Sequence, residues 1–450
     1  MIDADKSKNN STTHRKRKTG PKIFAKATIR LWGELIGTVM EYENGRIGFS
    51  YDSDYLRNGG LAISPKFLPL EARTFEFSDL QRQAAFMGLP GVLADSLPDT
   101  FGNLIIKKYF EERGELEKSM SPVQRLLYVG NRGMGALEYA PQLQRKSAEE
   151  ERTLEIKSLV ESARRLIEGD AGEAIHEIMR VGGSAGGARP KALILWDREK
   201  NKVRSGFANH RVGEEHWLIK FDGINSASER DNRAKPFNRI EYTYALLAKE
   251  LGIEMEEVSY AEDGPLFHFM TRRFDRTQTA KHHMHSLAGM THVDYNLPGA
   301  YSYESWLRLI QELHLGYPAM DQAYRRMIFN MVGRNQDDHV KNSSFLMKEK
   351  LSDWALAPAY DLTYSAGLGY TRQHQMTVAG HGDEFTRDEL IDFGKKFDIH
   401  HPEMILNATV DAFSQWSTLG KQWGVEAEDR KRVTAGHRLY LAKQSHPDCL

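Results

Sequence analysis

The sequence predicts an α+β fold with a β-rich N-terminal subdomain, a small lobe rich in strands, and a large lobe made mainly of helices. Three observations lead to this prediction. Two runs of alternating apolar and polar residues flank Asn44-Gly45, the strongest short signal for a β-hairpin. Strand and helix patterns alternate after residue 174, and apolar residues recur at helical spacing from about residue 302.

Four segments follow from these patterns. Residues 1–22 form a basic tail, 23–145 the N-terminal subdomain, 146–285 the small lobe with a connector and a glycine-rich loop, and 286–450 the helical large lobe. The tail carries seven Lys or Arg and two Asp, in a chain of formal net charge −1. With almost nothing to bury, it is expected to be disordered. It is either a solubilising arm or a contact to the phosphates of nucleic acid.

The composition argues against a membrane or secreted protein. No apolar run approaches the ~20 residues of a membrane span, and the first twenty residues lack the apolar segment of a signal peptide. The lone cysteine, Cys449, cannot form an internal disulfide, which fits a reducing compartment. We therefore expect a globular cytoplasmic protein that does not bind membranes.

The segment from Gly333 to Asn342 is the most informative. Asp337 precedes Asn342 by five positions, and Asp361 follows after two short strand patterns. Protein kinases use this order of residues to transfer a phosphoryl group. One carboxylate takes the proton of a hydroxyl, while the amide oxygen and the second carboxylate hold Mg²⁺ on ATP. The sequence thus predicts a protein-kinase-like bilobal fold, with Asp337 as the catalytic base and Asn342 and Asp361 as metal ligands.

Other interpretations of this loop stay open at this point. Asn and Asp are common turn residues in any protein. Asp338 competes with Asp337 for the role of base, although the five-residue step to Asn342 favours Asp337. His339 and Lys341 either steady the loop or contact phosphate. A metal hydrolase site built on Asp337, Asp338 and His339 is also conceivable, but it needs a denser cluster of ligands than one loop provides.

Two residues before this loop fit the same chemistry. Lys220 closes the apolar strand pattern of residues 216–221, as does the kinase lysine that contacts the α- and β-phosphates. Glu241 lies near the start of the helix pattern that follows, where it can pair with Lys220. The alternative is an ordinary acidic residue of a first helical turn.

Two further motifs are ambiguous. The glycine-rich loop from Val181 to Lys191 can present backbone N–H groups to phosphate, or it is a flexible turn. It is not a Walker A loop, because Ala188 stands where a lysine is required. The segment from Lys281 to His285 holds three histidines without a nearby carboxylate or cysteine. We expect surface residues there rather than a metal site.

Taken together, these motifs resemble the HipA family of bacterial toxin kinases, over most of the chain from about residue 23. The resemblance rests on Asp337 to Asn342, Tyr360-Asp361, Asp95 to Asp99, Gly187 to Lys191, Ile219-Lys220, Glu241-Tyr242 with Leu247 to Gly252, and Arg273 to Arg276. Two positions depart from the family pattern: Arg189 replaces a glutamine and Arg272 an acidic residue.

The resemblance implies roles for further residues. ATP contacts would come from Lys220, Arg272, Phe274, His339 and Tyr360, with Glu241 and Lys341 in support. Ser184 would be the autophosphorylated serine, whose modification ejects the glycine-rich loop and silences the kinase.

The resemblance also implies a cellular role. The protein would be a serine/threonine kinase and the toxin of a toxin–antitoxin system. It would halt translation by phosphorylating an aminoacyl-tRNA synthetase. A HipB-like helix-turn-helix antitoxin would restrain it, and their complex would repress its own operon by binding operator DNA. Two alternatives differ from this role: a small-molecule kinase with the same ATP residues, and a pseudokinase that stabilises an antitoxin on DNA.

Overall fold

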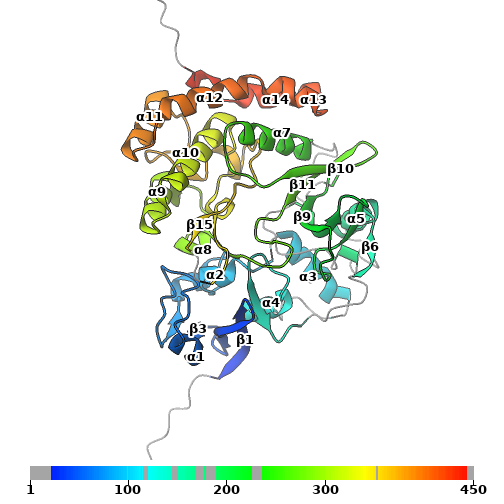
Figure 1. Ribbon diagram of the computed structural model, residues 1–450, viewed down its shortest axis with the longest axis vertical. Helices are drawn as coiled ribbons and strands as arrows, with labels where there is room; N and C mark the ends of the chain where they lie inside the picture. The colour runs from blue at the N-terminus through cyan, green and yellow to red at the C-terminus, as the bar shows by residue number, and fades with distance from the viewer. Residues whose placement is uncertain are drawn as a thin grey trace, which may run out of the picture.

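The computed structural model describes residues 22–98, 100–112, 114, 120–143, 151–168, 177–178, 189–224, 236–350 and 353–442 (Figure 1). Residues 1–21 of the basic tail, and Ser184 with most of the glycine-rich loop, lie outside these residues. Within the described part the chain has four sheets and a large set of helices. The predicted mixed α+β class is therefore confirmed.

Residues 22–143, called the N-terminal unit below, fold around a five-stranded sheet. Its strand order is β4-β3-β2-β1-β5, and its apolar face buries residues such as Ile29, Val39 and Phe49 in one core. The strands are β1 (Ile23–Leu31), β2 (Glu34–Tyr42), β3 (Ile47–Tyr51), β4 (Thr74–Glu76) and β5 (Leu137–Ala140). The helices are α1 (Ser53–Arg57), α2 (Gly91–Ala94), α3 (Thr100–Glu112) and α4 (Pro122–Val129).

The predicted hairpin joins β2 and β3, but its turn differs from the expected one. The sequence suggested a two-residue turn with positive φ at both Asn44 and Gly45. Only Gly45 has a positive φ, of 79°, and its N–H donates to the carbonyl of Tyr42 at 2.8 Å. A three-residue loop with glycine in the left-handed region satisfies the strand twist as well.

The second unit is a six-stranded sheet of order β10-β11-β9-β7-β8-β6. The central strands β7 and β9 bury apolar residues such as Leu193, Trp217 and Ile219. Its strands are β6 (Thr153–Leu154), β7 (Lys191–Asp197), β8 (Lys202–Ser205), β9 (Glu214–Lys220), β10 (Val258–Asp263) and β11 (Leu266–Arg272). Two helices belong to it, α5 (Ile156–Glu168) and α7 (Phe237–Glu250), and α7 lies between the sheet and the C-terminal helices (Figure 1).

The rest of the chain is mainly helical, with the long α10 at its centre (Figure 1). Its helices are α8 (Leu287–Thr291), α9 (Tyr303–Glu312), α10 (Gly316–Gly333), α11 (Arg387–Lys396), α12 (Pro402–Ser414), α13 (Trp416–Gln422) and α14 (Ala427–Gly436). Short strands complete it: β12 (His283–Ser286), β13 (Tyr301–Ser302), β14 (Ser344–Met347), β15 (Ala355–Leu356) and β16 (Met376–Thr377). Because β12 pairs with β14, the boundary expected at residue 285 falls inside a strand of this part.

Helix α10 ends one residue later than the sequence suggested. Gly333 was expected just past its end, as the left-handed cap. Instead Gly333 is the last helical residue and Arg334 takes the left-handed conformation, with φ 55°. Glycine is needed at 333 for space, since a Cβ there would lie 2.8 Å from Cε1 of Phe413. The helix thus packs tightly against α12 just before the chain enters the Asp337 segment.

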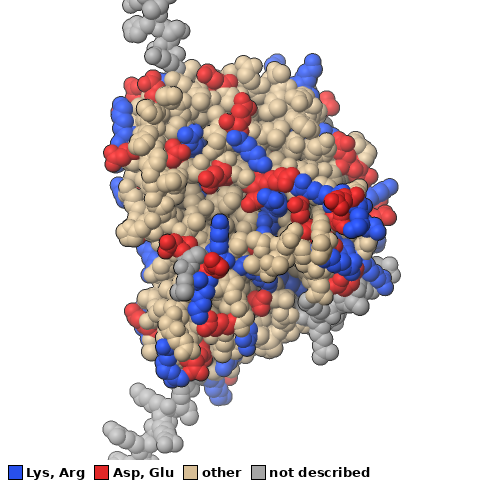
Figure 2. All heavy atoms as spheres, in the orientation of Figure 1, with Lys and Arg blue, Asp and Glu red and all other residues tan. Residues whose placement is uncertain are grey.

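Basic and acidic side chains are intermixed on the face seen in Figure 2. Within the described part of the chain, none of the helices is both long and apolar enough to cross a membrane.

Candidate active site

A pocket of 460 Å³ lies where the six-stranded sheet, α7 and the N-terminal unit meet residues 334–342, which we call the Asp337 loop. All site residues predicted from the sequence line this pocket, apart from Ser184, which is outside the described residues. They are Lys220, Glu241, Arg272, Phe274, Asp337, His339, Lys341, Asn342, Tyr360 and Asp361. Segments up to 141 positions apart therefore meet in one cavity.

Lys220 is the cation at the centre of this pocket. It ends β9, and its Nζ donates to Oε1 of Glu241 at 2.6 Å and also to Oδ1 of Asp361. Helix α7 is fixed to the same strand end, because the amide of Asn238 donates to the carbonyl oxygen of Lys220 at 3.0 Å. The sequence suggested the pairing of Lys220 with Glu241, and the structure contains it.

Burial and the charges of neighbouring groups together shift the pKa values of Lys220, Glu241 and Asp361. Burial alone would lower the pKa of Lys220, but Asp361 and Glu241 outweigh it and raise that pKa above its ordinary range. Burial raises the pKa of Glu241. Burial acts in the same direction on Asp361, but the nearby ammonium groups of Lys220 and Lys191 keep the pKa of Asp361 below its ordinary value. The site therefore holds a permanently charged lysine between two carboxyl groups.

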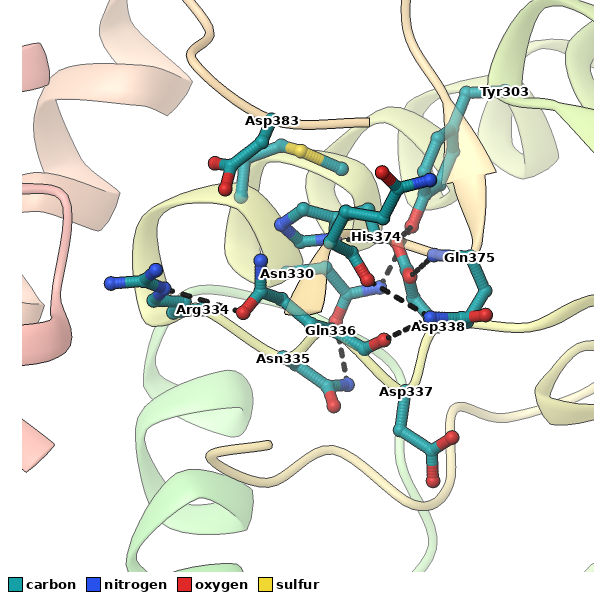
Figure 3. A network of polar contacts seen from close by, with 12 residues as sticks. Tyr303, Asn330, Arg334, Asn335, Gln336, Asp337, Asp338, His374, Gln375 and Asp383 are labelled. Carbon is teal, nitrogen blue, oxygen red and sulfur yellow. Dashed lines mark hydrogen bonds and ion pairs between the residues drawn. The ribbon is translucent and has the colours of Figure 1, made fainter. Parts of the chain in front are cut away.

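The side chains of two adjacent aspartates in the Asp337 loop, Asp337 and Asp338, point in different directions (Figure 3). Asp338 points into the protein, where its side chain is fully buried and accepts hydrogen bonds from Tyr303, His374 and the backbone of Gln375. Asp337 points away from this network and its side chain is 43% exposed. Asp338 is thus committed to the protein interior, and Asp337 is the one that faces the pocket.

The surroundings of Asp337 make it a stronger base than a free aspartate. Burial, followed by the negative charges of Asp361 and Asp338, raises its pKa, against the opposing effect of His339. The imidazole of His339 lies 3.8 Å from Oδ1 of Asp337. A raised pKa brings a general base closer to the operating pH, which favours proton transfer.

Asn342 and Asp361 provide oxygen atoms of the kind that Mg²⁺ prefers. The Nδ2 group of Asn342 donates to the backbone carbonyl of Asp337 at 2.8 Å, so its carbonyl oxygen is the atom left for a ligand. Asp361 has a left-handed backbone, with φ 54°, a conformation that costs energy for a non-glycine residue and clusters at functional sites. The donor set fits a magnesium ion that is shared with phosphates.

Tyr360 connects the Asp337 loop to β14 through its hydroxyl group. Its hydroxyl donates to the carbonyl oxygen of Lys341 at 2.7 Å and lies 2.6 Å from the hydroxyl of Ser344. Its ring lies 5.5 Å from that of Phe274, which places two aromatic faces beside the pocket. The position of Arg272 is less favourable for a ligand contact. Its side chain pairs with Glu256 and its backbone N–H is bonded to the carbonyl of residue 257.

The expectation for the histidines near residue 283 is wrong. His283 and His285 were expected on the surface, but both are fully buried in β12. His285 bonds through Nδ1 to Asp95 at 2.8 Å, and His283 through Nε2 to the carbonyl of Ile63 at 2.9 Å. A loop was expected because the segment is polar, yet Nε2 of His283 and both ring nitrogens of His285 have partners in the N-terminal unit. Among the residues that the structure describes, no three His, Cys, Asp or Glu side chains gather as a metal cluster.

Asp95 is a pocket residue whose role sequence reasoning did not identify. Besides His285, it accepts from the backbone N–H of Ser286 at 2.8 Å and from the hydroxyl of Ser286. Burial raises its pKa, but His285 and Lys341 outweigh this and lower it. Asp95 begins the segment Asp95 to Asp99, one of the motifs that resemble the HipA family, but the sequence alone predicts no chemical role for it.

The N-terminal unit also forms one wall of the pocket. Leu97, Asn103 and Arg125 are among its lining residues. The same unit holds the segment after β11, because the N–H of Gly135 donates to the buried Asp275 at 2.7 Å. These contacts could not be predicted from the sequence, since they join distant segments that share no recognisable motif.

The fold and the site together define a class: a mixed α+β protein whose strand lysine, helix glutamate and Asp–Asn–Asp set are arranged as in a kinase. The model of the HipA N-terminal domain matches residues 27–140, and that of the HipA-like C-terminal domain matches residues 183–418. The chain belongs to the HipA family, so the resemblance inferred from its motifs is confirmed.

A solved structure agrees with this fold. The chain is similar to HipA of Shewanella oneidensis MR-1, solved with HipB and its operator DNA, at 17% sequence identity and a TM-score of 0.62, over 92% of this chain and 95% of that one. It also matches the Helicobacter pylori proinflammatory kinase CtkA at 12% identity and a TM-score of 0.34, over 50% of this chain and 85% of that one. No curated protein matches the chain.

Proposed function

We propose that this protein is an ATP- and Mg²⁺-dependent serine/threonine protein kinase. The observation that carries the proposal is the meeting of Lys220, Glu241, Asp337, Asn342 and Asp361 in one pocket. The first two are 21 positions apart and the last three lie in another part of the chain, so chance proximity is a poor explanation. The intact set also argues against a pseudokinase.

The residues divide the work of phosphoryl transfer. Lys220 would neutralise the phosphates, and Asn342 and Asp361 would hold Mg²⁺, which would stabilise the negative charge of the transferred phosphoryl group. Asp337 orients the acceptor hydroxyl and takes its proton. Because the transition state is loose, positioning and electrostatics provide most of the rate. Asp361 pairs with Lys220 in this structure, so this pair must loosen for Asp361 to hold the metal.

Loss of the Asp337 carboxylate tests the mechanism. Asp337→Ala should bind Mg·ATP normally and transfer phosphate at least ~10² times more slowly. Transfer of radiolabel from [γ-³²P]ATP and calorimetric titration with ATP measure the two properties. Asp392→Ala is the matched control, because its side chain is 69% exposed on α11. A tenfold or smaller loss of rate in Asp337→Ala would exclude Asp337 as the base.

We further propose that the kinase is the toxin of a type II toxin–antitoxin system in the cytoplasm. Membership of the HipA family supports this, as does the similarity to a HipA that was solved with HipB and operator DNA. The partners would be a HipB-like helix-turn-helix antitoxin, operator DNA through their complex, and an aminoacyl-tRNA synthetase as substrate. Growth arrest by the wild type but not by Asp337→Ala, with rescue by the neighbouring antitoxin gene, tests this role.

Ser184 is proposed as the site of autophosphorylation. Arg189 and Lys191 follow Ser184 in the same loop, and their charges reach the site. The guanidinium of Arg189 has a lowering effect on the pKa of Asp337 and of Glu241, and the ammonium of Lys191 has the same effect on the pKa of Asp361. Intact mass after incubation with Mg·ATP should rise by one phosphate in the wild type and not in Ser184→Ala. Equal gains in both proteins would remove Ser184 from the proposal.

A further inference from the structure

Arg438 follows the last long helix and reaches back to the end of α10. Its backbone N–H donates to the carbonyl of Val332 at 2.9 Å, and its guanidinium donates to the carbonyl of Met331 at 2.6 Å. These carbonyls belong to the last turn of α10, where the helix itself offers no partners. A cation at a helix C-terminus also interacts favourably with the helix dipole. Arg438 therefore completes the helix that leads into the Asp337 loop.

The same guanidinium reaches the loop through one histidine, His374, which Figure 3 shows together with Asp338. Nη1 of Arg438 lies 3.0 Å from Nε2 of His374, and Nδ1 of His374 lies 2.8 Å from Oδ2 of Asp338. Arginine can only donate and a carboxylate can only accept. His374 must therefore be neutral, with its proton on Nδ1. Arg438 thereby selects the tautomer that holds Asp338.

Asp338 transmits this constraint to its neighbour. Asp338 also accepts from the hydroxyl of Tyr303 and from the N–H of Gln375, both at 2.7 Å. With every member of this chain of contacts buried, movement of Asp338 would leave polar groups unpaired, at a cost of about 1–3 kcal/mol each. Since Asp337 is joined to Asp338 by a peptide bond, its backbone is fixed relative to the core while its side chain remains in the pocket.

We propose that Arg438 is a positioning residue for Asp337, acting through His374 and Asp338. The inference rests on the proposed kinase function, in which Asp337 is the base. Arg438 lies beyond residues 183–418, the part that matches the C-terminal domain model, so the family match does not point to it. Arg438 is not among the residues that line the pocket of Lys220, which predicts an effect on phosphoryl transfer rather than on ATP binding.

The first test separates these two effects. Arg438→Met should lower kcat for phosphate transfer from Mg·ATP at least tenfold and change KM for ATP less than twofold. Arg432→Met is the matched control: this arginine lies six positions earlier, where it pairs with Asp429 on the surface. A KM increase as large as the kcat loss would indicate general damage and overturn the proposal. Arg438→Lys, which keeps the charge with fewer donors, replaces Arg438→Met if that variant does not fold.

The second test asks whether Arg438 acts through His374. In His374→Asn the amide nitrogen replaces Nδ1 as donor to Asp338, but the acceptor that Nε2 offered to Arg438 is lost, while Arg438 keeps its contacts with Met331 and Asp383. Arg438→Met should therefore cause little further loss of kcat in the His374→Asn background, since the two residues belong to one chain of contacts. Equal losses in both backgrounds would show that Arg438 acts by another route.

A third measurement does not depend on catalysis. Hydrogen exchange of the Gln375 amide reports directly on Asp338, to which it donates. Arg438→Met should speed exchange at Gln375 and in residues 335–342 at least tenfold, and leave residues 269–273 of the sheet unchanged. Unchanged exchange at Gln375 would refute the positioning role even if the kinase is active. Conversely, the kinase proposal alone would be refuted if the wild type transferred no phosphate while Arg438→Met still showed faster exchange than the wild type.

Discussion

Replacement of Lys220 by methionine should destabilise the protein in a pH-dependent way. Methionine fills a similar volume but leaves Glu241 and Asp361 without their shared cation. The side chains of Lys220 and Glu241 are only 12% and 5% exposed, so screening by water is small. Removal of one partner of such a buried pair costs about 3–5 kcal/mol. In a folding unit of 150–250 residues this corresponds to a melting temperature lower by roughly 6–20 °C.

The pH dependence distinguishes this cause from simple loss of packing. Burial already raises the pKa of Glu241 above its ordinary value, and without Lys220 it should rise further. A carboxyl group whose pKa is higher in the folded than in the unfolded state destabilises the fold as the pH rises above its unfolded pKa. The deficit of Lys220→Met should therefore be larger at pH 8 than at pH 5. Adding Glu241→Gln removes the second buried charge and should recover part of the loss.

Differential scanning calorimetry without nucleotide, at pH 5, 6.5 and 8, measures these changes for the wild type and the two variants. Lys421→Met is the matched control, because Lys421 is an exposed lysine at the end of α13. The reasoning would be refuted if Lys220→Met melted within 1 °C of the wild type at pH 8, or if its deficit were the same at all three pH values.

Three further results are expected. Asp95→Asn should lower stability by about 2 kcal/mol, because an NH2 group replaces one of the two carboxylate oxygens that accept from His285 and Ser286; urea unfolding measures this, and no change in midpoint would contradict it. Gly333→Ala should lower the free energy of unfolding by about 1–3 kcal/mol, since the new Cβ meets the Phe413 ring. Adding Phe413→Leu should recover part of this loss, and equal melting temperatures of the single and the double variant would contradict this. Stability should also fall steeply below pH 6.5, by up to roughly 5 kcal/mol per pH unit. The reason is that burial lowers the pKa values of four histidines, so the unfolded chain binds more protons than the folded one. Thermal melts from pH 7.5 to 5.5 that indicate uptake of less than one proton on unfolding would contradict this. The histidines are His216 and His437, with pKa about 3, and His283 and His292, with pKa about 4.

The parts of the site that the sequence predicted are those with local signatures. A lysine at a strand end, a glutamate at the start of the next helix and a fixed step from Asp337 to Asn342 are all visible within short windows. The same holds for the strands and helices, whose apolar periodicity is local. Where these predictions failed, at Gly333 and in the hairpin turn, the failure was by one residue and arose from packing against a distant ring or from a second way to satisfy the strand twist.

The parts that could not be predicted depend on contacts between distant segments. Asp95 and His285 are 190 positions apart, and neither has a chemical role until the other is placed beside it. The buried histidines of β12 are polar in sequence and therefore suggested a surface loop. Likewise, Asp338 could not be separated from Asp337 as the base until His374 and Tyr303 were known to occupy it.

The contact between the C-terminal segment and the Asp337 loop has a consequence for synthesis of the chain. Arg438 is translated 100 residues after Asp338, which takes about 5–20 s on a bacterial ribosome. Once Asp361 has been translated as well, the nascent polypeptide carries every residue proposed for phosphate transfer. It still lacks Arg438, the arginine proposed to position Asp337. The phosphate-transfer activity proposed for this chain would thus begin only after the C-terminal segment has been synthesised and has docked on α10.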